Sequence, residues 1–231
     1  MTDYKSFLKP GERIDLFSGL KVIQKIDGPR FSLDAVMLSQ FTRVKKDDLV
    51  MELGTGNGIV ALLLARDTRS QQVTGIEIQE ELADLARRNV RLNGLDDKIR
   101  ILTEDLRLVE KNHQPGQFDL IVSNPPYRRL GDGRLNPNPL KAISRHEIKC
   151  NLNDILKASF YLLKNRGRAN FVYRPDRFVD IITESRANRL EPKRLQFVHP
   201  GLNKNANLML LELMKNGQPE LTILNPKILQ G

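Results

Sequence analysis

The sequence is poor in the residues that build disulfide-linked or metal-dependent scaffolds. It contains a single cysteine, Cys150, among 231 residues, which excludes an internal disulfide. Its three histidines, His113, His146 and His199, are scattered along the chain and form no metal-ligand motif. We therefore expect a protein without a disulfide framework and without a bound metal.

Long apolar runs are also missing. No stretch approaches the roughly 18 apolar residues that a membrane span requires, and the first six residues have no apolar core of a signal peptide. Apolar residues make up 40% of the chain and charged residues 28%, as in ordinary globular proteins. We expect one domain over residues 1–231, located in the cytoplasm, with a monomer favoured over an oligomer.

Positive charge is concentrated in the second half of the chain. Residues 1–127 carry 18 Lys and Arg against 19 Asp and Glu, whereas residues 128–231 carry 19 against 9. The overall net charge of +9 therefore comes entirely from the second half. A one-sided basic surplus is typical of a polyanion-binding protein and favours nucleic acid as the partner.

Residues 1–43 carry the signals of a hairpin followed by a helix. Two short alternating runs, 14–17 and 21–26, flank Ser18-Gly19, which is a turn signal. Ser32 is a suitable N-cap for the helix that follows. This opening is too small to fold alone, so we interpret it as an extension of the main domain. Asp34, in the first turn of the helix, suits the helix dipole and is also a candidate cofactor contact.

A cofactor-binding half is predicted over residues 44–127. An apolar run at 49–53 leads into Gly54-Thr55-Gly56-Asn57-Gly58 and then into an apolar-periodic helix, so the unit is strand, glycine turn and helix. Glycines let the turn backbone approach a ligand closely. The spacing differs from the dinucleotide and P-loop patterns and contains no lysine. With the acid Glu52 just before it, the turn favours a ligand that has a cationic amino-acid end and no phosphate.

Two further strands end in acidic residues. The predicted strand at 73–77 ends in Glu77, about 20 residues past the glycine turn, where a carboxylate can accept both hydroxyls of a ribose. The predicted strand at 99–102 is followed by Glu104 and Asp105, which could accept from an adenine amine. Ligands of open parallel sheets bind at the carboxyl ends of the strands, so these acids predict a nucleoside site there.

The segment Asp119–Tyr127 is the candidate catalytic loop. An apolar run at 120–122 stops at Ser123-Asn124-Pro125-Pro126-Tyr127, as expected for a buried strand that delivers a loop to its carboxyl end. The two prolines fix their own φ angles and restrict the preceding residues. Asn124 and Tyr127 are therefore held with little freedom, which suits a pocket for a flat, hydrogen-bonding group.

A basic segment, residues 128–149, separates this loop from the substrate-side half at 150–231. It has little periodicity, and we interpret it as a flap that closes on phosphates. Its candidate RNA contacts are Arg128, Arg129, Arg134, Lys141 and Arg145. Beyond it we expect helices near 152–163 and 175–186, strands at 169–173 and 195–198, and a closing antiparallel pair formed by 207–215 and 221–224.

The motifs E-L-G-T-G-N-G (52–58), I-E-I-Q (76–79), E-D (104–105) and N-P-P-Y (124–127) resemble those of the class I S-adenosylmethionine-dependent methyltransferases that act on amino nitrogens. The segments 30–41, 145–147, 173–177 and 198–206 extend the resemblance to the bacterial tRNA adenine-N6 methyltransferases, which modify adenine 37 of a valine tRNA.

The resemblance implies a Rossmann-like α/β fold with a seven-stranded, mostly parallel sheet whose last strand is antiparallel. It also implies S-adenosyl-L-methionine as the cofactor and a tRNA as the substrate, in a tRNA-processing, RNA-modifying transferase. The cofactor contacts implied by the matching positions are Glu52, Gly54, Thr55, Gly56, Asn57, Gly58, Glu77, Ile78, Glu104, Asp105, Leu106 and Asn124. The implied catalytic group is Asn124, Pro125, Pro126 and Tyr127.

The chemistry of this loop follows from its residues. An exocyclic base amine is a poor nucleophile because its lone pair is delocalised. The side-chain oxygen of Asn124 and the carbonyl of Pro125 could accept its two N–H bonds and aim the lone pair at a sulfonium methyl group, which is positioning without a general base. Tyr127 would stack on the base, and a base inside a helical or stacked loop must first be turned out.

Three other functions remain open at this point. Guanine-N2 methylation of ribosomal RNA is disfavoured weakly by Tyr127, because an aliphatic residue or Phe is more typical there. Glutamine-N5 methylation of a protein usually accompanies a larger N-terminal domain than residues 1–31 provide. A non-catalytic nucleic-acid-binding module would not need Glu52, Glu77 and Asn124 all in place.

Overall fold

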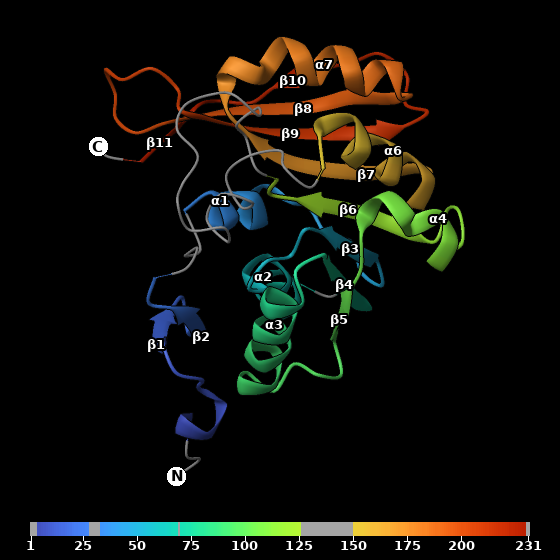
Figure 1. Cartoon of the computed structure of the whole chain (residues 1–231). Helices are drawn as coiled ribbons and strands as arrows, with labels where there is room; N and C mark the ends of the chain where they lie inside the picture. Colours follow the sequence, from blue (N-terminus) through green and yellow to red (C-terminus); the bar gives the residue numbers. More distant parts are fainter. Residues whose placement is uncertain (1–3, 28–32, 69, 126–149, 230–231) are drawn as a thin grey trace.

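A mixed β-sheet forms the centre of the protein (Figure 1). The computed structural model describes residues 4–27, 33–68, 70–125 and 150–229. Within these ranges the main sheet has nine strands, in the order β10-β8-β9-β7-β6-β3-β4-β5, with β11 also paired to β8. The strands are β3 (Leu49–Leu53), β4 (Gln72–Glu77), β5 (Ile99–Thr103), β6 (Phe118–Ser123), β7 (Leu163–Tyr173), β8 (Leu190–His199), β9 (Leu208–Lys215), β10 (Thr222–Ile223) and β11 (Lys227–Ile228).

The strand directions confirm the predicted topology. Strands β3 to β7 pair in parallel, and β9 lies antiparallel between β7 and β8. Strand β8 therefore runs parallel to the first five, and β9, the last of the seven main strands, is the antiparallel one. The predicted closing pair of 207–215 with 221–224 is wrong. Strand β10 instead pairs in parallel with β8, because both edges of β9 are already occupied.

Helices cover both faces of the sheet (Figure 1). One apolar core packs α1 (Leu33–Phe41), α2 (Ile59–Asp67) and α3 (Glu80–Leu92) against one face. A second core packs α4 (Val109–Asn112), α6 (Leu152–Leu162) and α7 (Phe178–Ala187) against the other. Short 3-10 turns lie at η1 (Tyr4–Phe7), η2 (Leu106–Leu108) and η3 (Pro175–Arg177). This is the layered α/β arrangement in which ligands bind at the strand ends.

The N-terminal extension contains the hairpin that the sequence predicts. Strands β1 (Glu12–Phe17) and β2 (Leu20–Lys25) pair antiparallel around Ser18-Gly19, both of which have positive φ angles. Positive φ at both central residues gives the turn type that matches strand twist. The fully buried Ile23 packs with Leu85 of α3, so the hairpin is attached to the main domain by its own apolar side chains. Among the helices in the described ranges, none is both long enough and apolar enough to cross a membrane.

Candidate active site

The carboxyl ends of β6, β3, β4 and β5 lie next to one another at one edge of the sheet. The register pairs Val122 of β6 with Glu52 of β3, Leu53 with Ile76 of β4, and Glu77 with Thr103 of β5. The residues that follow these strands therefore project from the same edge. This brings together the glycine turn, Glu77, the acids after β5 and the start of the candidate catalytic loop (Figure 1).

The glycine turn joins β3 to α2 in a conformation that needs glycine. Gly54, Gly56 and Gly58 all have positive φ angles, of 73°, 56° and 84°. Its start is fixed by the amides of Gly54 and Thr55, which both donate to the Ile76 carbonyl of β4 at 2.9 Å. A Cβ at Gly54 or Gly56 would meet no atom within 4 Å, so the turn backbone faces open space at these two positions.

Glu52 holds the turn from the inside. Its side chain is only 2% exposed, and its Oε2 accepts from the Thr55 hydroxyl at 2.6 Å and from the Ala61 amide at 3.0 Å. Burial, with a smaller contribution from the charge of Glu77, raises the pKa of Glu52 to about 8 despite these hydrogen bonds. Glu52 therefore lies on the buried side of the turn, and it can affect a bound ligand only through Thr55 and the first turn of α2.

Glu77 is the last residue of β4. Its Oε2 accepts from the Gly56 amide at 3.0 Å, and its Oε1 accepts from the Gln79 amide at the same distance. Burial raises the pKa of Glu77, and these backbone hydrogen bonds oppose that shift. The Ile78 amide and the Gln79 side chain also donate to this carboxylate, so hydrogen bonds from its own loop fix its orientation at the strand end. Ile78 follows it and is half-buried.

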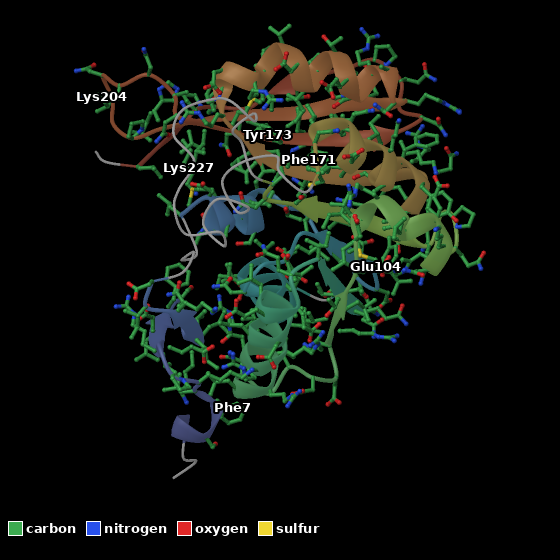
Figure 2. The ribbon with its side chains drawn as sticks, in the orientation of Figure 1. Phe7, Glu104, Phe171, Tyr173, Lys204 and Lys227 are labelled. Atoms are coloured by element: carbon green, nitrogen blue, oxygen red, sulfur yellow. The ribbon has the colours of Figure 1, made fainter. Side chains whose placement is uncertain are left out.

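The acids after β5 differ in their surroundings. The Oε2 of Glu104 forms a hydrogen bond with His113 Nε2 at 3.0 Å. Its buried Oε1 has no hydrogen-bond partner among the described residues. Figure 2 labels Glu104 beyond the end of β5. Asp105 instead caps η2 by accepting from the Arg107 amide at 3.0 Å. Leu106 is half-buried and packs at the edge of the second core.

The loop after β6 begins beside the glycine turn. The Ser123 hydroxyl donates to the Leu53 carbonyl at 2.7 Å and ties the two strand ends together. Asn124, which follows, is half-buried, and Pro125 is buried. Pro126 and Tyr127 lie outside the described residues, as do the candidate RNA contacts Arg128, Arg129, Arg134, Lys141 and Arg145.

The remaining candidates are Asp34 of α1 and Asn57 and Gly58 of the turn. Asp34 is half-buried in the first turn of α1. The side-chain amide nitrogen of Asn57 is buried and has no hydrogen-bond partner among the described residues. A Cβ at Gly58 would lie 3.2 Å from the Cβ of Ala86, so glycine there also allows α3 to pack close against the turn.

Sequence reasoning missed three residues that support the site. They are Ser123, which joins β6 to β3; His113, which holds Glu104; and Asn89 of α3, whose side chain donates to the Asn57 carbonyl at 2.9 Å. The available signal for Asn89 was its spacing from Asn93, since two asparagines four residues apart share one face of a helix and disfavour helix formation unless they have a partner. Within the described residues, no three His, Cys, Asp or Glu side chains form a potential metal site.

The sequence comparisons agree with this geometry. Residues 33–138 match the family model described as methyltransferase small domain. A Tolumonas auensis protein named tRNA1(Val) (adenine(37)-N6)-methyltransferase is 27% identical over 79% of this chain and 75% of its own length. A Vibrio campbellii protein of the same name is 28% identical over 81% of this chain and 77% of its own.

Solved structures share the fold at lower sequence identity. A crystal structure from Agrobacterium tumefaciens, described as a predicted O-methyltransferase, superposes with a TM-score of 0.68 at 21% identity over 85% of this chain and 88% of its own. Methanocaldococcus jannaschii Trm5 in complex with adenosine gives a TM-score of 0.65 at 14% identity over 91% of this chain and 58% of its own. The family model, the named relatives and the sheet topology together support a class I S-adenosylmethionine-dependent methyltransferase.

Proposed function

We propose that this protein is a tRNA adenine-N6 methyltransferase that uses S-adenosyl-L-methionine and modifies adenine 37 of a valine tRNA. The relatives with matching names support the substrate. The observation that carries the proposal is the register of β6 and β3, which puts Asn124 and Pro125 directly beside the glycine turn. A tRNA substrate also implies that the protein works in the cytoplasm.

The residues at the strand ends fit the proposed cofactor. The turn backbone faces open space at Gly54 and Gly56, and Asn57 offers a buried donor without a partner in the described part of the chain. Glu77 at the end of β4 is the proposed acceptor for ribose hydroxyls, and Glu104 has a buried oxygen, without a partner among the described residues, that suits an adenine amine. A buried polar atom without a partner is costly, so a ligand that pairs with Asn57 and Glu104 gains affinity from both.

The chemistry assigned to this chain is orientation of the target amine. When bound, S-adenosylmethionine supplies a sulfonium methyl group, whose bond to sulfur breaks as its bond to nitrogen forms. The Asn124 side-chain oxygen and the Pro125 carbonyl accept the two amine hydrogens and direct the nitrogen lone pair toward that methyl group. The proton leaves from a cationic product nitrogen, which is acidic enough to lose it to water. No residue with a pKa near neutrality is required for this step.

Substrate identity can be tested with purified protein and tritiated S-adenosylmethionine. The RNA to use is an unmodified transcript of valine tRNA, and the matched control is the same transcript with guanine at position 37. We expect label only in the first, recovered as N6-methyladenosine after digestion to nucleosides. Label in ribosomal RNA as N2-methylguanosine, or in a release factor as methylglutamine, would replace this function with one of the alternatives. Calorimetry that detects no binding of S-adenosylmethionine would exclude all three methyltransferase functions.

Replacing Asn124 by alanine tests the assigned chemistry. Asn124→Ala removes an acceptor that acts on the target amine, so we expect kcat to fall by about 100-fold or more, while affinity for S-adenosylmethionine changes by less than about threefold. Single-turnover methylation and calorimetry measure the two quantities separately. The matched control is Asn165→Ala, an exposed residue near the amino end of β7 and so at the opposite end of the parallel strands. Unchanged turnover in Asn124→Ala would remove Asn124 from the mechanism.

A further inference from the structure

The side chain of Asn89 hydrogen-bonds to two separate parts of the molecule. It lies on α3 and is fully buried. Its side-chain oxygen accepts from the Ile23 amide at 2.6 Å, and its side-chain nitrogen donates to the Ile23 carbonyl at 3.1 Å. Both groups belong to β2, so Asn89 pairs with the hairpin as a neighbouring strand would.

The same side chain reaches the glycine turn. The Asn89 nitrogen also donates to the Asn57 carbonyl at 2.9 Å, 32 residues away in the sequence. Beside this bond, α3 packs closely against the turn, because Gly58 leaves room for Ala86. One buried amide therefore holds the backbone of the hairpin and the backbone of the turn in a fixed relation. Since the amide is buried, neither partner can exchange it for water without cost.

We propose that Asn89 is a positioning residue that couples the N-terminal hairpin to the glycine turn. As a result, S-adenosylmethionine binding and the ordering of the hairpin stabilise each other. The inference rests on the proposed function, in that the turn is taken to bind S-adenosylmethionine. Such coupling is reciprocal. A ligand that fixes the turn protects the hairpin, and a loosened link to the turn weakens ligand binding.

Asn93 supplies a matched control from the same helix face. Its side chain accepts from the Lys21 amide at 3.0 Å and donates to the Lys21 carbonyl at 2.8 Å. Its third bond goes to the Asn89 carbonyl at 2.8 Å and not to the glycine turn. Asn93→Ala and Asn89→Ala therefore both remove two bonds to the hairpin, but only Asn89→Ala removes the bond to the turn.

The first experiment uses the unaltered protein and hydrogen exchange. Saturating S-adenosylmethionine should slow exchange of the Ile23 amide, which Asn89 holds, by about tenfold or more. The exposed far edge of the sheet at β10 should show no such change, because it has no contact with α3. Equal exchange at Ile23 with and without the ligand would overturn the coupling. This measurement stands even if Asn89→Ala does not fold.

The second experiment compares the two variants by calorimetry and steady-state kinetics. Asn89→Ala should weaken S-adenosylmethionine binding and raise its KM by about tenfold, with kcat within about twofold, because the lost interaction acts on the turn and not on the amine. Asn93→Ala should change the affinity much less, because its hairpin exchanges faster but stays folded and keeps the Asn89 bond to the turn. Equal affinities in the two variants would overturn the inference but leave the proposed function intact. Absence of binding to the unaltered protein would instead overturn the proposed function and the inference with it.

Discussion

The protonation of Glu52, beside the glycine turn, should make the stability of the protein depend on pH. Burial raises its pKa to about 8, whereas an unfolded chain would titrate near 4.3. Between these values the folded protein keeps a proton that the unfolded chain has released. The free energy of unfolding should therefore fall as pH rises from about 5 to about 8, by roughly 1.4 kcal/mol per pH unit at most, and level off above that.

Glu52→Gln is the direct test of this pH dependence, because glutamine imitates the protonated acid and keeps an acceptor for Thr55 or Ala61. Urea denaturation of both proteins at several pH values should give a difference in stability that grows in favour of the variant as pH rises. Glu77, whose pKa is raised in the same direction, is present in both and cancels in the comparison. Parallel stability curves would show that Glu52 is ionised in the folded state.

Glu77 is predicted to bear directly on cofactor affinity. Its carboxylate shapes the turn by accepting from the Gly56 amide and is the proposed acceptor for the ribose hydroxyls. Since hydrogen bonds to a charged group contribute about 1.5–3 kcal/mol, Glu77→Ala should weaken S-adenosylmethionine binding by about 10-fold to 100-fold in calorimetry. Glu80→Ala is the control, because that exposed acid pairs with Arg87 on the surface. A similar loss in both variants would point to a general charge effect instead.

At the scale of elements, a partly buried ion pair adds to the apolar contacts and to the Asn89 and Asn93 bonds that hold the hairpin. Arg88 of α3 contacts both carboxylate oxygens of Glu12 of β1, at 2.6 and 2.7 Å. Burial alone would raise the pKa of Glu12, but the bonds from Arg88 and the Lys9 amide hold it below its ordinary value. Removing one partner of a buried pair typically costs about 3–5 kcal/mol. Because Arg88 and Glu12 are only partly buried, Arg88→Ala should lower stability by less than that and should release the hairpin to proteolysis.

The exposed Lys9–Asp84 pair provides the comparison for Arg88→Ala. Because surface ion pairs contribute about 0–1 kcal/mol, Lys9→Ala should leave both the cleavage pattern and the denaturation midpoint nearly unchanged. A replacement of Arg88 and Glu12 together by apolar residues should recover part of the loss, since no buried charge is then left alone. Resistance of Arg88→Ala to proteolysis would show that apolar packing around Ile23 suffices to hold the hairpin.

The elements that the sequence predicts well are those with a local signal. The runs that became β3, β4 and β6 are apolar because both faces of those strands are buried. Strand β7 begins at Leu163, earlier than the predicted 169, because residues 164–167 are polar, fall in a register shift and carry no apolar pattern that would predict a strand. Strand β10 was misassigned for a similar reason, since its partner depends on which sheet edge is free.

In the candidate site, too, the sequence predicts only the features that have a local signal. Strand ends can be located from apolar runs, so the sequence predicts where Glu52, Glu77 and Glu104 gather. It does not predict what each acid contacts. Glu52 lies on the buried side of the turn and accepts hydrogen bonds from Thr55 and Ala61. Glu104 forms a hydrogen bond with His113, the residue that follows α4. These partners come from segments whose relative placement is decided by packing of the whole domain.

At the scale of the whole molecule, the proposed function assigns cofactor binding and RNA binding to different halves of the chain. The strands that carry the glycine turn and the acids belong to the half with a balanced charge, and the excess of positive charge follows residue 127. Electrostatic attraction to RNA releases counterions, so it is measured by the slope of the logarithm of affinity against the logarithm of salt concentration. The position of the charges, and not only their number, should set that slope.

Neutralising Arg128, Arg129 and Arg134 to glutamine should weaken tRNA binding and reduce the salt slope by about 2–3, because each phosphate contact contributes about 0.7–0.9. The measurement is fluorescence anisotropy with labelled valine tRNA over a range of salt concentrations. Affinity for S-adenosylmethionine should stay the same, which separates loss of RNA contacts from damage to the fold.

A second triple variant controls for net charge alone. Lys45, Lys46 and Lys98 are exposed and precede β3 and β5, so they lie at the opposite edge of the parallel strands from the glycine turn. Their replacement by glutamine removes the same three charges but should change the slope by less than about 0.5, because these lysines touch no phosphate in the proposed complex. Equal slopes in the two triple variants would mean that RNA is attracted by the overall charge, and that residues 128–149 do not act as its binding segment.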